Sequence, residues 1–258
     1  MVASSTTAEL DRLLSLADWT SPEAFLAADA PRLAPLWRTL LTTDGSTTLF
    51  LQAFCRTPIT LEQIDQQPAL LPPLTGWIDA HGLDRGQRPG EQSAGGGERV
   101  GETRGAGASP TETQNISGIS SPHGPPHDLL ATRAAAIDLA PGRPVVQRRV
   151  WLTDGRRRLA LGYALILRER LSPALQERLA AGTHPIGLLA EELKLPSVRD
   201  RLQVGRLTDH DLARQFGAPH DSTTDTLWCR RYRLHIPDAM TAAILEIFSP
   251  SLEQYQTA

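Results

Sequence analysis

The stretch VQRRVWLTDGRRRLALGYALIL, residues 146–167, decides the fold class of this chain. Its first part alternates with the two-residue period of a β-strand. The side chains on one face belong to Val146, Arg148, Val150 and Leu152. Asp154-Gly155 is a typical hairpin turn, and the apolar run 159–167 supplies a returning strand. The stretch therefore predicts a pair of antiparallel strands.

The remainder of the C-terminal half extends this pattern. Three more segments have strand character, at 198–207, 227–236 and 242–248. Between them and the hairpin, Ser172-Pro173 opens a helix that Gly182 closes, and 185–195 is a second short helix. Strands joined by hairpins and short helices predict a single antiparallel sheet with covering helices.

The N-terminal part is mostly helical in pattern. Helix starts are indicated by a capping box at Thr6–Glu9, by Ser21-Pro22 and by the break at Asp44-Gly45-Ser46. An apolar helical face runs from Leu33 to Leu41, and residues 59–61 alternate as one short strand. The expected class is α+β, in the form of one domain spanning 1–258.

Residues 85–127 differ in composition from everything around them. They hold ten of the twenty glycines and five of the twenty prolines, and they contain no aromatic residue. Such a segment cannot bury enough apolar surface to offset the entropy lost on ordering. We therefore expect a long disordered insert within the domain.

Composition excludes several classes of protein. Lys+Arg 26 against Asp+Glu 29 gives a net charge of -3, so no basic field attracts nucleic acid or acidic lipid. There is no run of 18 apolar residues and no signal-peptide pattern, which predicts a cytoplasmic protein without membrane contact. Cys55 and Cys229 are too few for a disulfide framework or a four-cysteine zinc site.

Common catalytic motifs are missing from the sequence. It contains neither a P-loop nor a GxGxxG after a strand, and no GxSxG elbow. The seven histidines are scattered without metal-ligand spacing. We therefore expect no cofactor and no metal.

Two charged residues stand out because apolar neighbours flank them on strands. Arg148 shares a face with Val146 and Val150, and Glu246 lies between Ile244 and Phe248. A buried charge is costly unless an opposite charge meets it. Either these two residues belong to a site for a charged ligand, or they pair with each other in the core.

Two arginine groups are interpreted as solvated. Arg156-Arg157-Arg158 follows a hairpin turn, and Arg230, Arg231 and Arg233 lie on one strand. For most of the second group we expect a water-facing side of the sheet.

Four blocks of sequence resemble one family, the chorismate lyases, and especially their cyanobacterial type. The blocks are Leu36-Trp37-Arg38-Thr39-Leu40-Leu41 with Asp44-Gly45-Ser46-Thr47-Thr48, Arg148–Gly155, His184-Pro185-Ile186-Gly187, and Leu227–Leu234 with Leu245–Pro250. No single block is specific, but their order and spacing together are. They span 36–66 and 144–250, and the insert falls where the family needs only a connection.

The resemblance implies a set of site residues. The substrate-binding arginine of the family matches Arg148, or Arg149 if the register slips by one, and its active-site glutamate matches Glu246. The backbone N–H that binds a carboxylate falls at Ile186, in the turn before Gly187. The apolar lid contact of the family falls at Ser46, a small polar residue, which is a departure from the pattern.

The resemblance also implies an activity. A chorismate lyase converts chorismate to 4-hydroxybenzoate and pyruvate without a cofactor, and its product supplies a quinone head group such as that of plastoquinone. Glu246 would either orient the ring hydroxyl or shuttle the proton, and the expected protein is a monomer. Three alternatives stay open: a non-catalytic effector-binding domain of the same fold, an inactive relative in which Arg148 and Glu246 pair, and an enzyme that makes another hydroxybenzoate isomer.

Overall fold

The period-two stretch forms the hairpin that its sequence predicts. A computed structural model describes residues 5–29, 32–71, 142–182, 184–217 and 226–256. In it, β3 (Pro144–Thr153) and β4 (Arg158–Leu167) pair antiparallel, with Val150 opposite Gly162. Gly155 takes a positive φ of 88° in the turn, a conformation that glycine adopts without steric cost.

This hairpin is part of one seven-stranded sheet whose order is β1-β5-β6-β7-β4-β3-β2. Every neighbouring pair is antiparallel. The other strands are β1 (Asp18–Thr20), β2 (Thr60–Leu70), β5 (Val198–Thr208), β6 (Thr226–Ile236) and β7 (Met240–Phe248). With helices on both faces, the predicted α+β class with a single antiparallel sheet is confirmed.

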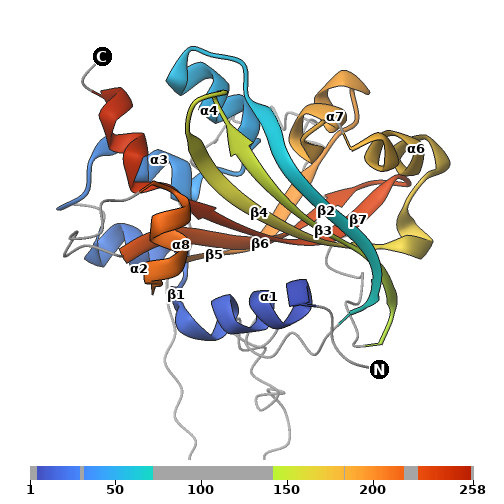
Figure 1. Ribbon diagram of the computed structural model, residues 1–258, viewed down its shortest axis with the longest axis horizontal. Helices are drawn as coiled ribbons and strands as arrows, with labels where there is room; N and C mark the ends of the chain where they lie inside the picture. Colours follow the sequence, from blue (N-terminus) through green and yellow to red (C-terminus); the bar gives the residue numbers. More distant parts are fainter. Residues whose placement is uncertain (1–4, 30–31, 72–141, 183, 218–225, 257–258) are drawn as a thin grey trace, which may run out of the picture.

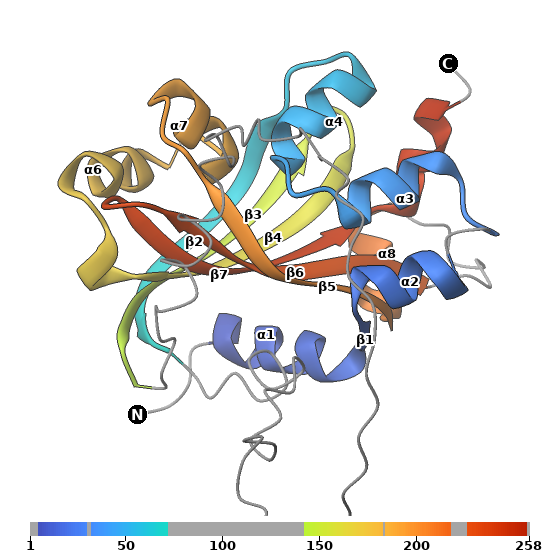
Figure 2. The same ribbon diagram turned by 180° about the vertical axis from the view of Figure 1, so that it is seen from behind.

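The helices cover the sheet unequally (Figures 1 and 2). The long helix α1 lies across one face, and α4, α6 and α7 lie on the other. The α-helices are α1 (Ser5–Leu16), α2 (Pro22–Ala28), α3 (Pro35–Thr42), α4 (Thr47–Cys55), α6 (Pro173–Ala181), α7 (Ile186–Glu192) and α8 (His210–Gln215). Two 3₁₀ segments are η2 (Arg168–Arg170) and η3 (Pro250–Gln256). None of the described helices has the length and apolar character needed to cross a membrane.

Three of the helices begin at a serine whose side chain caps the first turn. The hydroxyl oxygens of Ser21, Ser46 and Ser172 accept hydrogen bonds from backbone N–H groups in the first turns of α2, α4 and α6. Gly182 ends α6 in the left-handed conformation, as expected from the sequence.

Three elements differ from the sequence prediction. The expected short strand at 59–61 is the beginning of β2, which runs to Leu70 and tolerates Pro68 because it is an edge strand. Strand β1 and helix α8 were not predicted, because three and six residues are too few to show a period. The predicted insert at 85–127 lies outside the described residues, and the single-domain organisation stays a prediction.

The core divides into three hydrophobic clusters. One lies under α1 and includes Leu10, Trp151 and Leu245. The other two share the opposite face: a cluster around α2, α3 and α4 that includes Leu152 and Phe248, and a cluster around α6 and α7 that includes Ala164 and Ile244. Between these two clusters the sheet carries polar side chains, and the candidate site lies there.

Candidate functional site

A cleft of about 550 Å³, its open mouth included, lies on the sheet between the two clusters. Its floor comes from β3, β4, β6 and β7, and its walls come from the starts of α4 and α7 and from β5. The cleft therefore collects side chains from segments that are far apart in the sequence.

One row of residues crosses the floor in register. Val150, Gly162, Glu246 and Arg230 lie directly opposite one another on β3, β4, β7 and β6. Gly162 has no side chain, so the space beside Glu246 stays open, and a Cβ there would lie 3.3 Å from Val150 Cγ2. Gly162 is not among the residues predicted from the sequence, although a glycine inside a strand often marks a close approach by a ligand or another chain segment.

Glu246 accepts hydrogen bonds from three buried donors. Arg230 Nε and Thr47 Oγ1 donate to Oε2 over 2.7 Å and 2.6 Å, and Tyr232 OH donates to Oε1 over 3.2 Å. Three donated hydrogen bonds, one of them from the charged guanidinium, hold the carboxylate of Glu246 in one orientation. Oε1 is the less occupied of the two oxygens.

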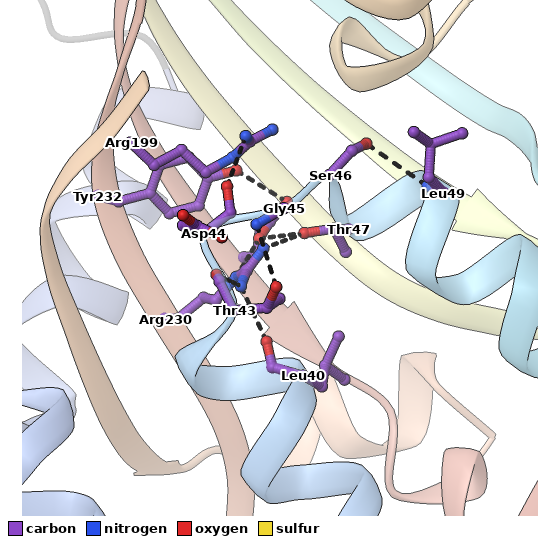
Figure 3. A network of polar contacts seen from close by, with 11 residues as sticks. Leu40, Thr43, Asp44, Gly45, Ser46, Thr47, Leu49, Arg199, Arg230 and Tyr232 are labelled. Carbon is purple, nitrogen blue, oxygen red and sulfur yellow. Dashed lines mark hydrogen bonds and ion pairs between the residues drawn. The ribbon is translucent and has the colours of Figure 1, made fainter. Parts of the chain in front are cut away.

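Arg230 connects Glu246 to the chain that enters α4. Figure 3 shows Arg230 among Leu40, Thr43 and Thr47. Its Nη1 donates to the carbonyls of Leu40 and Thr43, each over 2.8 Å, and its Nη2 donates to Thr47 Oγ1. Burial, the largest single influence, would lower the pKa of Arg230, but Glu246 and Tyr232 together outweigh it and raise that pKa. Each nitrogen of the guanidinium therefore has an acceptor within the protein, and the side chain holds the α3–α4 connection against the sheet.

The expectation of a water-facing arginine strand is wrong. Arg230, Arg231 and Arg233 are at most 2% exposed. Arg231 Nε donates to Gln203 over 2.6 Å, and Arg233 Nε donates to Asp200 over 2.7 Å. Strand β6 is an inner strand covered on both faces, so each arginine has internal acceptors in place of water.

Arg148 is 2% exposed and lines the cleft. Its Nη2 donates to the His184 carbonyl over 3.0 Å, while its Nε has no acceptor among the described residues. No carboxylate of the described chain forms an ion pair with it, so the alternative in which Arg148 pairs with Glu246 is wrong. Burial without a counter-charge lowers the pKa of Arg148 to about 10.

Arg149 points to the opposite face. Its guanidinium pairs with Glu9 of α1 at 3.0 Å and donates to Tyr163 OH over 3.1 Å. The register across β3 and β4 therefore directs Arg148, and not Arg149, into the cleft.

The starts of α4 and α7 meet at the wall of the cleft. Ser46, Ile186 and Gly187 all line it, and the Ile186 and Gly187 amides belong to the first turn of α7, where N–H groups lack a preceding helical carbonyl. A Cβ on Gly187 would lie 2.2 Å from Ser46 Oγ, so the two helices approach this closely because residue 187 is glycine.

Arg199 of β5 also lines the cleft and was not predicted from the sequence. Its Nη1 donates to the Asp44 carbonyl over 2.8 Å, and its guanidinium lies 5.7 Å from the centre of the Tyr232 ring. Figure 3 shows Arg199, Tyr232 and Arg230 side by side. Among the described residues, no group of three His, Cys, Asp or Glu side chains is placed to hold a metal ion.

Comparison with known proteins gives one family and a distant structural likeness. Residues 119–256 match the family described as Chorismate pyruvate-lyase Rv2949c-like. No curated protein matches the chain. Among solved structures, the ligand-binding domain of a protein described as a GntR-family transcriptional regulator from Bordetella bronchiseptica is 18% identical, with a TM-score of 0.35, over 46% of this chain and 77% of its own.

Proposed function

Because this chain belongs to the Chorismate pyruvate-lyase Rv2949c-like family, we propose that it removes pyruvate from chorismate and releases 4-hydroxybenzoate. The matched residues include all the predicted site residues except Ser46. The first block, at 36–66, lies outside the match, and the cyanobacterial subtype stays a prediction. A quinone head group as the destination of the product is likewise part of the proposal.

The observation that carries this proposal is the buried guanidinium of Arg148, which has no counter-charge among the described residues. A buried cation is costly unless an anion meets it, and no described side chain supplies one. A carboxylate can accept two parallel hydrogen bonds from a planar guanidinium. Arg148 would therefore hold the ring carboxylate of chorismate, with the Ile186 amide beside it at the start of α7.

Glu246 would act on the ring hydroxyl. Since Arg230 and Thr47 occupy Oε2, the less occupied Oε1 is the atom that can accept a hydrogen bond from that hydroxyl. This contact would orient the ring over Gly162. Glu246 is ion-paired, which favours an acceptor role over that of a general acid.

The reaction then balances without an added reactant. The ether bond between the ring and the enolpyruvyl oxygen breaks, and the ring carbon that bears the hydroxyl loses its hydrogen as a proton. The departing enolpyruvyl group gains one proton and becomes pyruvate, while the ring becomes aromatic. The residues of the cleft would bind and orient the substrate for this elimination.

The test is to incubate the purified protein with chorismate and to quantify 4-hydroxybenzoate and pyruvate by chromatography. We expect equal amounts of both products. Arg148→Gln should lower kcat/KM by about 10- to 100-fold, the loss expected for a charge-assisted hydrogen-bonded contact.

Arg149→Gln is the matched control, because it removes the neighbouring arginine on the opposite face. It should reduce stability through the lost contact with Glu9 and leave kcat/KM nearly unchanged. Intact chorismate together with tight binding of 4-hydroxybenzoate would overturn the lyase and favour the effector-binding alternative. A different hydroxybenzoate isomer would overturn the product assignment alone.

A further inference from the structure

The cleft has more positive charge than one carboxylate needs. Three arginines, Arg148, Arg199 and Arg230, lie in it or directly behind it, and among the residues that the structure describes Glu246 is the one acidic side chain that lines it. The ion pair between Arg230 and Glu246 is neutral, so Arg148 and Arg199 remain as cations without a carboxylate partner among the described residues.

The guanidinium of Arg199 is held in place, but not all of its nitrogens have an acceptor among the described residues. One end of its guanidinium is fixed by the Asp44 carbonyl, and the ring of Tyr232 supports its plane. Its Nε is buried and finds no acceptor in the described part of the chain. A buried donor without an acceptor costs free energy, and a ligand oxygen would relieve that cost.

A β-bulge is what turns Arg199 toward the cleft. Asp200 lies opposite Arg233 and Gln203 opposite Arg231, so β5 has one residue more than β6 over this interval. Arg201 takes a left-handed φ of 53° there, which is uncommon for a residue other than glycine. The extra residue reverses the alternation, and bulges that re-aim a side chain are frequent beside active sites.

The bulge places Arg199 opposite Leu234, on the same face as Val204, although the two residues are five positions apart in the chain. In an unbroken strand Arg199 and Val204 would point to opposite faces. The left-handed conformation of Arg201 in the bulge therefore affects the cleft. It allows the guanidinium of Arg199 to lie on the face of the sheet that forms the cleft floor.

We propose that Arg199 forms a second anion subsite, which binds the enolpyruvyl carboxylate of chorismate while Arg148 binds the ring carboxylate. This inference rests on the proposed function. Two uncompensated cations match a substrate with two carboxylates. The product 4-hydroxybenzoate has one carboxylate and would use Arg148 alone, and pyruvate would remain at Arg199.

The test compares Arg199→Gln with Arg206→Gln, an exposed arginine on the same strand that lies over Trp228 outside the cleft. Steady-state turnover of chorismate gives kcat/KM, and competitive inhibition gives the inhibition constants of 4-hydroxybenzoate and pyruvate. For Arg199→Gln we expect kcat/KM to fall at least tenfold, pyruvate inhibition to weaken, and the inhibition constant of 4-hydroxybenzoate to change less than twofold.

Arg206→Gln should resemble the wild type in all three quantities, and melting temperatures establish that both variants fold. Arg199→Lys retains the charge without the planar donor pair, so its kcat/KM should lie between those of the wild type and Arg199→Gln. Equal losses for chorismate and 4-hydroxybenzoate, or no loss for either, would overturn the second subsite.

Failure of the proposed function gives a different result. If chorismate is not consumed, its dissociation constant can be measured directly by calorimetry beside that of 4-hydroxybenzoate. A selective loss of chorismate binding in Arg199→Gln would then support the subsite in a protein that is not a lyase. Absence of binding of both compounds to the wild type would overturn the subsite and the proposed function together.

Discussion

Gly187 and Ser46 meet so closely that a Cβ on Gly187 would lie 2.2 Å from Ser46 Oγ. Ser46 cannot simply turn aside, because the same oxygen accepts the hydrogen bond from Leu49 N–H that caps α4. The contact joins the first turns of the two helices that wall the cleft. A single absent methyl group thus sets the distance between α4 and α7.

Gly187→Ala should therefore separate the two helices or displace the α4 cap. We expect a loss of about 1–3 kcal/mol in the free energy of unfolding, the usual range for overpacking, and weaker substrate binding. Urea denaturation and the KM for chorismate measure the two effects.

The double variant Ser46→Ala/Gly187→Ala removes the clashing oxygen, and the remaining distance from the new Cβ to the Ser46 Cβ is 3.3 Å. It should recover most of the lost binding while retaining the cost of a missing cap, about 1 kcal/mol. If Ser46→Ala fails to rescue Gly187→Ala, the steric explanation is wrong.

Glu246→Gln should abolish turnover and also destabilise the protein. The substitution leaves the Arg230 guanidinium buried without its counter-charge, which costs about 3–5 kcal/mol. The free energy of unfolding and the rate of pyruvate release are the two readouts.

Adding Arg230→Met to Glu246→Gln separates structure from chemistry. The double variant has no uncompensated charge at this pair, so it should be more stable than the sum of the two single changes predicts. It should remain inactive. Additive losses in the double variant would show that the pair is not coupled.

Gly162→Ala tests the floor of the cleft. A methyl group there would contact Val150 Cγ2 at 3.3 Å and fill part of the space beside Glu246. Alanine is favoured over glycine inside a strand by roughly 0.5–1 kcal/mol, so stability should be unchanged or slightly higher. The KM for chorismate should rise. A stable variant with unchanged KM would contradict the position proposed for the ring.

His235 gives a pH-dependent prediction away from the cleft. It is 7% exposed, its Nδ1 lies 3.0 Å from Thr241 Oγ1, and burial together with Arg233 lowers its pKa from 6.5. The unfolded chain therefore binds this proton more tightly than the folded chain, and stability is lost as the pH falls below about 6.5.

His235→Asn removes that titration. The wild type should lose stability relative to this variant between pH 6.5 and the lowered pKa, by at most about 1.4 kcal/mol per pH unit. Thermal unfolding of both proteins across this range measures the difference. Parallel pH profiles would refute the prediction.

Local chemistry in the sequence was sufficient for most of the fold. The alternation over 146–167 and the Asp154-Gly155 turn specify a hairpin, because residues that pair across a tight turn are neighbours in the chain. Serine caps and Gly182 likewise set helix ends through bonds made within a few residues. Strand β1 is the opposite case, since its three residues are a strand by virtue of pairing with β5.

The cleft is formed by contacts between residues far apart in the sequence, and local sequence patterns do not predict such contacts. Alternation could place Glu246 and Arg148 on apolar faces, but strand order decided that Glu246 lies opposite Arg230 and leaves Arg148 without a counter-charge among the described residues. Arg199 reached the site through one extra residue in β5, which reverses every side chain before it. Most of the strands and helices, with β1 and α8 as exceptions, can be read from the sequence alone, because those preferences act over a few residues. Which charges meet cannot be read from the sequence in this way, because register and strand order are set by packing across the whole sheet.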